Sequence, residues 1–364
     1  MSKIVIDARE SGTSTGRYTD KMIEYLHQLK PKHEIILLAK KHRLDYLHGI
    51  APSFQIIETP YKEFTFGEQL GFWRQISSLH ADLVHFPMVQ QPVLYRGRVV
   101  TTMQDLTGIR FRNPLRSALF YWIKLPVYKW VNKRAAHKSV AIITPTEFVK
   151  QDVAAYTGIS PGKITATLEA ADHISAKPEP VPTLKGKQFI MYTGRPAPNK
   201  NLGRLIDAFA LLQQSHPDLQ LVLAGKIDGN YQLHADRVAR DGIKNVTFAG
   251  FVSEGQLRWL LENCTVYAMP SLSEGFSLTG VEAMMHGAPV VSSNATCLPE
   301  VHGDAAHYFD PLDPADIAAK IAEVVDNKKL RESLAAKGLK QAAKYSWKRM
   351  AEQTLAVYER ALGR

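Results

Sequence analysis

Two glutamates, Glu274 and Glu282, stand in a stretch whose pattern predicts a buried strand, a loop and a helix in succession. Gly275 lets the loop backbone approach a ligand closely, and a helix beginning near Ser277 directs N–H groups toward the same place, where they suit a phosphate. Carboxylates accept hydrogen bonds from sugar hydroxyls. The spacing therefore predicts loop amides that hold a diphosphate and glutamates that bind hydroxyls on either side. A solvated loop acid and an acid that stabilises the helix N-terminus would explain the same two residues.

A second loop carries two cations, Arg195 and Lys200. It follows the apolar segment 188–193 and precedes the predicted helix 202–214. Two cations that flank one strand-to-helix loop can hold a diphosphate between them. As isolated surface charges they would be unremarkable.

These loops need elements to position them, and the chain supplies alternating strand and helix patterns typical of a doubly wound α/β fold. The Pro- and Lys-rich stretch 172–187 predicts a linker. We therefore expect an amino-terminal domain over 1–180, a second domain over 181–345 and a terminal helix over 346–364. The predicted strands are 3–7, 34–38, 55–57, 83–86, 99–103, 140–144, 163–167, 188–193, 219–224, 246–250 and 266–269, and the clearest helices are 17–30, 202–214, 234–241, 254–262, 277–286, 314–326, 329–344 and 347–362.

The arrangement of Glu274 and Glu282 resembles the Glu-x7-Glu signature of glycosyltransferase family 4, whose members are retaining enzymes with the GT-B fold. The Gly-Arg-x4-Lys-Asn pattern around Arg195 and Lys200 resembles the phosphate-binding motif of that family. The resemblance covers nearly the whole chain and implies two Rossmann-like domains that face each other across a cleft. It also implies that the first half holds the acceptor and that the last helix crosses back to the first domain.

The resemblance also implies roles for individual residues. The family usually has His-Asp where this chain has Gln104-Asp105, and the amide can bind hydroxyls but cannot carry a proton near neutral pH. The implied catalytic residues are Glu274, Gln104, Asp105, Arg195 and Lys200. The implied donor-binding residues are Gly16, Gly194, Arg195, Lys200, Val252, Gly275, Phe276, Ser277, Leu278 and Glu282.

The function implied by the resemblance is transfer of a mannose- or rhamnose-like hexose from a nucleotide sugar to a glycan or lipid-linked acceptor in cell-surface polysaccharide synthesis. A GDP- or dTDP-hexose is the first expectation for the donor, and UDP-sugars stay open. No metal site and no other cofactor are expected. The replacement at Gln104 leaves open a non-catalytic nucleotide-sugar-binding or scaffold protein with the same fold.

Positive charge is concentrated in the first half of the chain. Residues 1–180 contain 24 Lys and Arg against 16 Asp and Glu, and the formal net charge of the whole chain is +10. The segment 110–138 mixes basic and aromatic residues without a single acid, a pattern that suggests docking on anionic lipid. A half-buried helix with a solvated basic face explains it equally well. Nucleic acid could also explain the charge, but no RNA-binding motif accompanies it, and no nucleic-acid partner is expected.

Cysteine usage and hydropathy predict a cytosolic protein. Cys264 and Cys297 provide neither a disulfide framework nor a metal-binding spacing, and no secretory signal or membrane-spanning run is evident. Together with the basic segment, this predicts a cytoplasmic location with peripheral docking on the inner face of the cell membrane.

Overall fold

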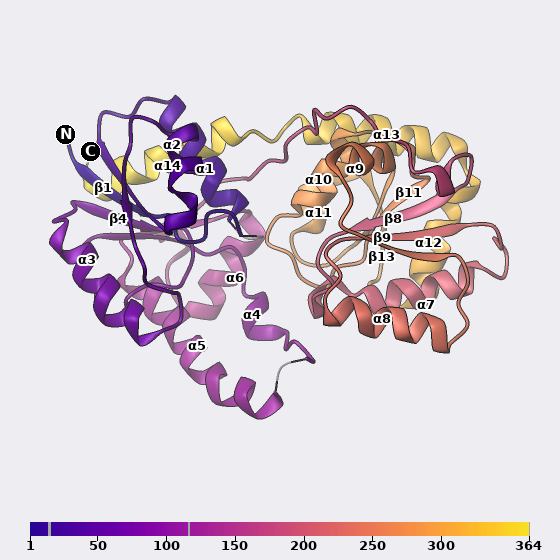
Figure 1. Cartoon of the computed structure of the whole chain (residues 1–364), viewed down its shortest axis with the longest axis horizontal. Coiled ribbons are helices and arrows are strands. Elements are labelled where there is room, and N and C mark those ends of the chain that lie inside the picture. Colours follow the sequence, from indigo (N-terminus) through magenta and orange to yellow (C-terminus); the bar gives the residue numbers. More distant parts are fainter. Residues whose placement is uncertain (14–15, 116, 364) are drawn as a thin grey trace. The chain divides into compact units, whose positions relative to one another are not determined.

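The structure is a computed structural model that describes residues 1–13, 16–115 and 117–363 (Figure 1). Ser14 and Thr15, which precede Gly16, and Arg116 of the basic segment 110–138 lie outside the described residues. The chain forms two compact units. The first contains residues 1–109, 122–169 and 346–364, and the second contains 110–121 and 170–345. The units thus change at 169/170, whereas the sequence analysis places the domain change at 180/181.

A seven-stranded parallel sheet forms the centre of the first unit, in the order β3-β2-β1-β4-β5-β6-β7. The strands are β1 (Lys3–Asp7), β2 (Glu34–Ala39), β3 (Gln55–Glu58), β4 (Leu83–Phe86), β5 (Val99–Thr102), β6 (Ala141–Thr144) and β7 (Ile164–Ala166). The helices connecting them are α1 (Arg17–Gln28), α2 (Leu44–Ile50), α3 (Trp73–Ser78), α4 (Thr107–Arg110), α5 (Ala118–Lys138) and α6 (Glu147–Thr157). Every predicted strand of this half is present, with ends shifted by one residue at most.

The second unit has a six-stranded parallel sheet in the order β10-β9-β8-β11-β12-β13. Its strands are β8 (Phe189–Thr193), β9 (Gln220–Ala224), β10 (Val246–Gly250), β11 (Val266–Met269), β12 (Val290–Ser293) and β13 (Ala306–Phe309). Its helices are α7 (Leu202–Leu212), α8 (Gly229–Arg240), α9 (Glu254–Asn263), α10 (Leu278–Met285), α11 (Leu298–His302), α12 (Pro314–Asp326) and α13 (Lys328–Ala342).

The inner strands of both sheets are buried along nearly their whole length, as expected where helices cover each side of a parallel sheet. In each sheet the strand order reverses direction once, at β1/β4 in the first and at β8/β11 in the second. Ligands of open α/β sheets bind outside the carboxyl ends of the strands at such a switch point. The topology therefore predicts ligand sites at the carboxyl ends of β1 and β4 and of β8 and β11.

Two helices differ from the sequence prediction. Helix α8 begins at Gly229 rather than near His234, because the Asp228 side chain accepts hydrogen bonds from the N–H groups of Asn230 and Tyr231 and so caps an earlier start. Proline often ends or kinks a helix, yet Pro126 lies inside the single helix α5.

The last helix, α14 (Trp347–Leu362), belongs to the first unit although it follows the second in sequence. Glu359 of α14 lies 2.8 Å from His33 Nε2, and Arg360 donates a hydrogen bond to Thr165 at 3.1 Å. The chain therefore returns to its first unit, as the family resemblance implied.

Among the described residues, no helix combines the length and the apolar character needed to cross a bilayer.

Candidate active site

The predicted donor-binding residues of the second unit, except Val252 after the edge strand β10, lie on the two loops at the switch point of its sheet and on the helix that follows. Strands β8 and β11 are parallel neighbours, with Val266 paired to Ile190. Residues 194–201 follow β8, and residues 270–277 follow β11, so the two loops leave the same edge of the sheet. Their proximity is thus a direct consequence of strand order.

An ion pair joins these two loops. Lys200 Nζ lies 2.6 Å from Glu274 Oε1, and the two side chains are 25% and 10% exposed. The Glu274 N–H donates to the Thr296 hydroxyl at 3.2 Å, and its carbonyl accepts from the Cys297 thiol at 3.2 Å. The cation predicted for the diphosphate and the carboxylate predicted for the sugar therefore hold each other.

Two asparagines that flank Lys200 fix the loops more firmly. Asn199 Nδ2 donates to the Ser273 carbonyl at 2.9 Å, and the Leu272 N–H donates back to the Asn199 carbonyl at 2.7 Å. Asn201 Nδ2 donates to the Pro270 and Pro311 carbonyls at 3.0 and 2.8 Å. Neither asparagine was assigned a role from the sequence, because their partners are backbone atoms distant in sequence.

The end of β8 requires glycine at position 194. Gly194 has a φ of +148°, and a Cβ there would lie 2.9 Å from the Tyr192 hydroxyl. The Gly194 carbonyl also accepts a hydrogen bond from the Tyr231 hydroxyl at 3.0 Å. The exposed Arg195 follows directly, so this packed turn sets where its backbone leaves the sheet.

The turn that leads into α10 directs its side chains inward. Phe276 is buried with its ring edge-on to Tyr345, at a centroid distance of 5.1 Å. Ser277 has a φ of +98°, and its hydroxyl lies 3.0 Å from His302 Nε2. Between Gly275 and Leu278, this turn can therefore offer a ligand its backbone rather than large side chains, as predicted for a diphosphate.

His302 holds this turn through its contact with the Ser277 hydroxyl, and it was not recognised from the sequence. It is fully buried, its Nδ1 lies 3.1 Å from the Ser292 hydroxyl, and burial lowers its pKa to about 3. A Cβ on Gly280 would lie 2.6 Å from His302 Nε2, so α10 must have glycine there to pack against the ring. The imidazole is a neutral hydrogen-bonding support.

Glu282 lies in α10 itself and is buried. Burial raises the pKa of the Tyr267 hydroxyl in β11, and the negative charge of the Glu282 carboxylate raises it further. The Glu282 carbonyl accepts from His286 Nδ1 at 2.8 Å, and His286 Nε2 accepts from the Ile174 N–H at 3.2 Å. The structure thus fixes Glu282 in the same strand–loop–helix element as Glu274.

Val252 follows β10, where Gly250 ends the strand with a φ of +66°. Phe251 projects into solvent, while Val252 is half-buried and packs against the core. Ser253 then starts α9 with a reciprocal capping box. The predicted contact of Val252 with a nucleobase stays a prediction.

In the first unit, Gln104 and Asp105 follow β5. Asp105 Oδ1 accepts a hydrogen bond from the Thr107 N–H at 2.8 Å and so orders the start of α4. Gln104 is half-buried, and its Nε2 atom has no hydrogen-bond partner among the described residues. The Gln104 amide lowers the pKa of Glu169, a buried residue after β7 that was not selected from the sequence.

A buried polar chain lies behind Gln104 and extends to the last helix. The Tyr18 hydroxyl lies 3.1 Å from the Thr102 hydroxyl, which lies 2.9 Å from His85 Nε2. His85 Nδ1 lies 2.6 Å from the Tyr358 hydroxyl of α14. Burial lowers the pKa of His85 to about 3, so the ring is a neutral link between β5 and α14.

Gly16 lies at the end of the loop between β1 and α1, directly before the first residue of α1. Its N–H donates to the Thr13 carbonyl at 3.1 Å, and a Cβ at this position would lie only 1.9 Å from the Glu10 carbonyl oxygen. No larger residue fits this turn without movement of the backbone. The residue is therefore required by the local fold, and its predicted contact with the donor is untested.

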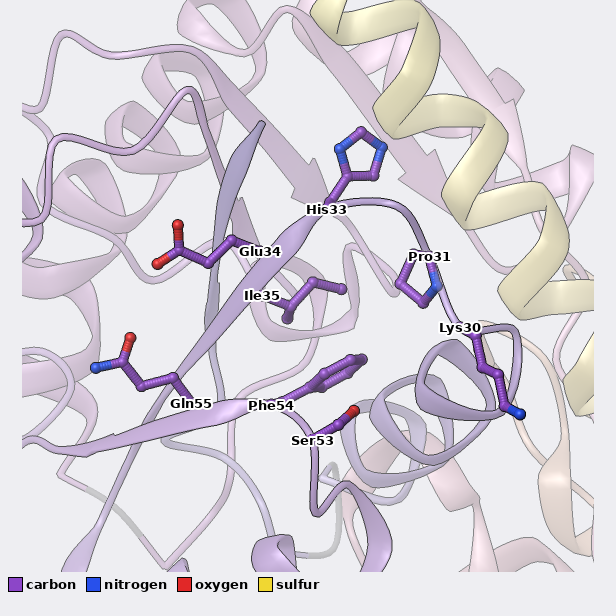
Figure 2. Close-up of a pocket in the computed structure, with 8 residues that line it drawn as sticks. All are labelled: Lys30, Pro31, His33, Glu34, Ile35, Ser53, Phe54 and Gln55. Carbon is purple, nitrogen blue, oxygen red and sulfur yellow. The ribbon is translucent and has the colours of Figure 1, made fainter. Parts of the chain in front are cut away.

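A hollow of about 270 Å³ lies at the opposite edge of the first sheet (Figure 2). It is lined by residues at the amino ends of β2 and β3, including Lys30, Glu34 and Gln55. The His33 ring points away from the other lining side chains, toward the Glu359 helix. None of the predicted site residues lines this hollow, and strand topology favours the carboxyl edge for ligands.

The described residues contain no group of three or more His, Cys, Asp or Glu side chains arranged to hold a metal ion.

Two family models match the chain and together span most of it. Residues 174–341 match the model "Glycosyl transferases group 1", and residues 15–167 match "Glycosyltransferase Family 4". O-antigen chain mannosyltransferase B of Escherichia coli is 32% identical over 62% of this chain and 63% of its own length. The MMP alpha-(1->4)-mannosyltransferase of Mycolicibacterium hassiacum is 30% identical over 68% of this chain and 62% of its own length. The chain spans less than two thirds of both relatives.

Solved structures share the fold across the whole chain. Sucrose-phosphate synthase from Thermosynechococcus elongatus gives a TM-score of 0.77 at 16% identity, covering 100% of both chains. WaaG, a glycosyltransferase involved in lipopolysaccharide biosynthesis, gives 0.72 at 15% identity, covering 97% of this chain and 99% of its own. The predicted GT-B fold class is confirmed. With both family models matched in their expected order, the chain belongs to the glycosyltransferases of group 1, with an amino-terminal part of the family 4 type.

Proposed function

We propose that this protein is a retaining glycosyltransferase that moves a hexose from a nucleotide sugar to a glycan or lipid-linked acceptor. The observation that carries the proposal is the meeting of Lys200 and Glu274 at the switch point of the second sheet. A cation for phosphate and a carboxylate for hydroxyls are the two groups that a nucleotide sugar requires side by side.

In the proposed reaction, the diphosphate replaces Glu274 as the partner of Lys200. Arg195, Lys200 and the backbone of the turn before α10 stabilise the negative charge that develops on the leaving diphosphate. Glu274, released from its ion pair, accepts hydrogen bonds from the hexose, and Glu282 accepts them from the ribose. These charges and dipoles supply the stabilisation that a metal ion provides in other transferases, so we propose catalysis without metal.

We propose a mannose-like hexose because the relatives described above are named mannosyltransferases. A GDP- or dTDP-hexose is the favoured donor, with UDP-sugars as the alternative. One solved neighbour, HepE of Anabaena, was crystallised with UDP and glucose, which is a fact about that protein at 16% identity. Retention of the anomeric configuration follows from the family and is part of the proposal.

The switch point of the first sheet supports an acceptor site there. A small hollow of about 10 Å³, room for about one water molecule, follows β1 and β4 and is lined by Asp7, Arg9, Glu10, Glu63, Pro87, Met88 and Gln90. Arg9 is buried, bonded through Nε and Nη2 to Asp7 and through Nη2 to Glu68, and its Nη1 has no partner among the described residues. Carboxylates and an amide can hydrogen-bond hydroxyls, so the surface around this hollow suits a polyhydroxylated acceptor.

Helix α5 supports peripheral docking on an anionic membrane surface. Trp122, Ile123, Val127 and Trp130 are all more than half exposed and recur at helical spacing, so they form one apolar stripe. Exposed basic residues flank this stripe on α5, namely Lys124, Lys129, Lys133 and Arg134. Lys138 differs, because its Nζ is turned to the Pro92 carbonyl at 2.7 Å and burial lowers its pKa to about 7. Lipid-facing residues flanked by cations are typical of interfacial helices, and a cytoplasmic, peripheral location is therefore part of the proposal.

A thermal-shift and turnover screen tests the proposed function. The purified protein is heated with GDP, dTDP and UDP and with GDP-mannose, dTDP-rhamnose and UDP-glucose, since a ligand that binds only the folded state raises its melting temperature. We expect one nucleotide and its sugar to raise the melting temperature, and that sugar to be transferred or slowly hydrolysed. Binding without turnover of any donor would instead indicate a non-catalytic nucleotide-sugar-binding protein.

A further inference from the structure

A buried acid with one unpartnered oxygen lies at the carboxyl edge of the first sheet. Glu169 follows β7 and is only 3% exposed. Its Oε1 atom has no hydrogen-bond partner among the described residues. Burying a carboxyl oxygen without a partner is costly, and most such groups in proteins are paired. The position therefore calls for a functional explanation.

The Gln104 amide is the polar group that faces Glu169. Strands β5 and β7 flank β6 in the parallel sheet, so the loops that follow them leave the same edge. Gln104 Nε2 is buried, although the side chain as a whole is half-buried, and the amide lowers the pKa of Glu169 by its proximity. A donor without a partner thus faces an acceptor without a partner, and the two do not form a hydrogen bond of ordinary length and angle.

We propose that Glu169 is a positioning residue that decides which end of the Gln104 amide faces the sugar. The inference rests on the proposed function, in which Gln104 is the sugar contact of the first unit. An ionised carboxylate can only accept hydrogen bonds, so it attracts Nε2 and leaves the amide oxygen on the outer side. The burial of Nε2 corresponds to this orientation. A protonated carboxyl can also donate, so it does not select one orientation.

The surroundings of Glu169 bring the change between its protonated and ionised forms close to neutral pH. Burial raises the pKa of Glu169 to about 7, against the opposing effects of the Gln104 amide and Arg17, and Asp105 raises it further. Tyr18 of α1 is the other titratable group that faces it, and the Glu169 charge contributes to the raised pKa of that hydroxyl. Gln104 alone cannot titrate, but Gln104 and Glu169 together form a unit that changes its hydrogen-bonding character with pH.

The test is the pH dependence of single-turnover sugar transfer, measured with the nucleotide sugar that the parent protein uses best. For the parent, the rate should rise as pH increases through about 7. Glu169→Gln has the same shape but does not titrate, so it should lose this rise and be slower by roughly tenfold at pH 8, the effect of losing one hydrogen bond from the Gln104 amide to the sugar. Affinity for the bare nucleoside diphosphate should stay unchanged, because that ligand has no sugar.

Glu34→Gln provides a matched control, since it makes the same change on an exposed residue at the opposite edge of the same sheet. It should behave like the parent. A carboxyl-carbon NMR titration of the parent, assigned with Glu169→Asp, measures the Glu169 pKa without turnover and covers the case in which a variant does not fold. A pKa near the ordinary value of 4.5 would overturn the inference.

Different results would contradict the positioning role of Glu169 and the proposed glycosyltransferase function. If the parent transfers sugar and Glu169→Gln keeps both its rate and its pH profile, Glu169 has no positioning role and the proposed function stands. If the parent binds no nucleotide sugar and transfers none, the proposed function and this inference fall together.

Discussion

At the scale of single residues, the ion pair between Lys200 and Glu274 explains how the donor site can be stable without a donor. Each charge satisfies the other at 2.6 Å while both are largely shielded from water. A diphosphate carries more negative charge than one carboxylate and can displace it from the lysine. In the proposed function, donor binding frees Glu274 for sugar hydroxyls, so the same exchange provides the diphosphate contact and the sugar contact.

Removing either a diphosphate cation or a hydroxyl acceptor should weaken this site. We predict that Lys200→Ala and Glu282→Ala each lower nucleotide-sugar affinity or turnover at least tenfold, about 1.4 kcal/mol. Lys185→Ala, on an exposed lysine of the same unit, is the control and should match the parent. Calorimetric titration with the preferred nucleotide sugar gives the affinities. Parent-like binding by both site variants, with folding intact, would rule out the assigned pocket.

Glu169 should also affect stability, with a sign opposite to that of a salt-bridged acid. Its pKa is raised from 4.5 to about 7, so the folded state keeps a proton that the unfolded chain has already lost between these values. The free energy of unfolding therefore falls by about 3 kcal/mol as pH rises from 4.5 to 7. Glu169→Gln should remove this loss. Urea titrations at pH 5 and pH 8 should show a larger gain from the substitution at pH 8, and an equal effect at both values would contradict the expectation.

At the scale of elements, α5 is unusual because it is apolar on two sides. Leu125, Ala135 and Ala136 are buried, whereas Trp122, Val127 and Trp130 are exposed. A helix at the surface of a unit normally presents one apolar stripe to the core and a polar face to water. The second stripe is the feature that a membrane surface would cover, and the sequence pattern did not separate it from the buried side.

Removing the outer stripe should abolish docking on lipid. We predict that Trp122→Ser combined with Trp130→Ser, at positions 63% and 54% exposed, prevents sedimentation with vesicles that contain anionic lipid, while transfer to a soluble acceptor persists. Binding by the parent should need anionic lipid and fade with added salt. Phe251→Ser, on an exposed aromatic of the other unit, should bind like the parent. Equal binding of the parent to neutral vesicles would instead favour a solvated basic face.

At the scale of the whole molecule, each unit contains a buried neutral histidine that links distant segments. His85 connects β5 to α14 in the first unit, and His302 connects α10 to β12 in the second. Burial lowers both pKa values from 6.5 to about 3. The stability due to each neutral ring is thus complete above pH 6.5 and is lost as pH falls toward 3.

This predicts an acid-sensitive fold in which both units lose stability below pH 6.5. The unfolded chain takes up protons at two imidazoles that the folded chain keeps neutral. Unfolding free energy from urea titration should therefore fall steeply between pH 6.5 and 4, and His302→Asn should show a shallower fall despite a lower starting stability. A parent whose stability is constant over this range would show that the two imidazoles are not held neutral.

Much of this architecture could be predicted from the sequence because strand length, apolar runs and loop residues are local signals. The strands around Glu274 and Arg195 lie where the pattern placed them, and parallel pairing then brings their loops to one edge. The start of α8 was misplaced because the Asp228 cap lies outside the hydrophobic periodicity.

The remaining site contacts join residues distant in sequence, which no local pattern reveals. The Lys200–Glu274 ion pair depends on β8 and β11 being neighbours, and His302 reaches Ser277 only through the packing of α11 against α10. Glu169 lies in a short loop with no motif of its own, and only its burial beside Gln104 distinguishes it. The resemblance to a family named the donor loops but gave no sign of these supports.

Nucleotide-sugar turnover at the Lys200–Glu274 site is tested most directly by comparing the parent with Lys200→Ala at equal concentration. The measured product is the nucleoside diphosphate released from the nucleotide sugar. GDP-mannose and dTDP-rhamnose are tested first, with UDP-glucose alongside. We expect the parent to release the diphosphate from at least one donor, and faster when acceptor glycan is added, whereas Lys200→Ala should be at least tenfold slower. No diphosphate release from any donor by the folded parent, or equal release by Lys200→Ala, would contradict this expectation.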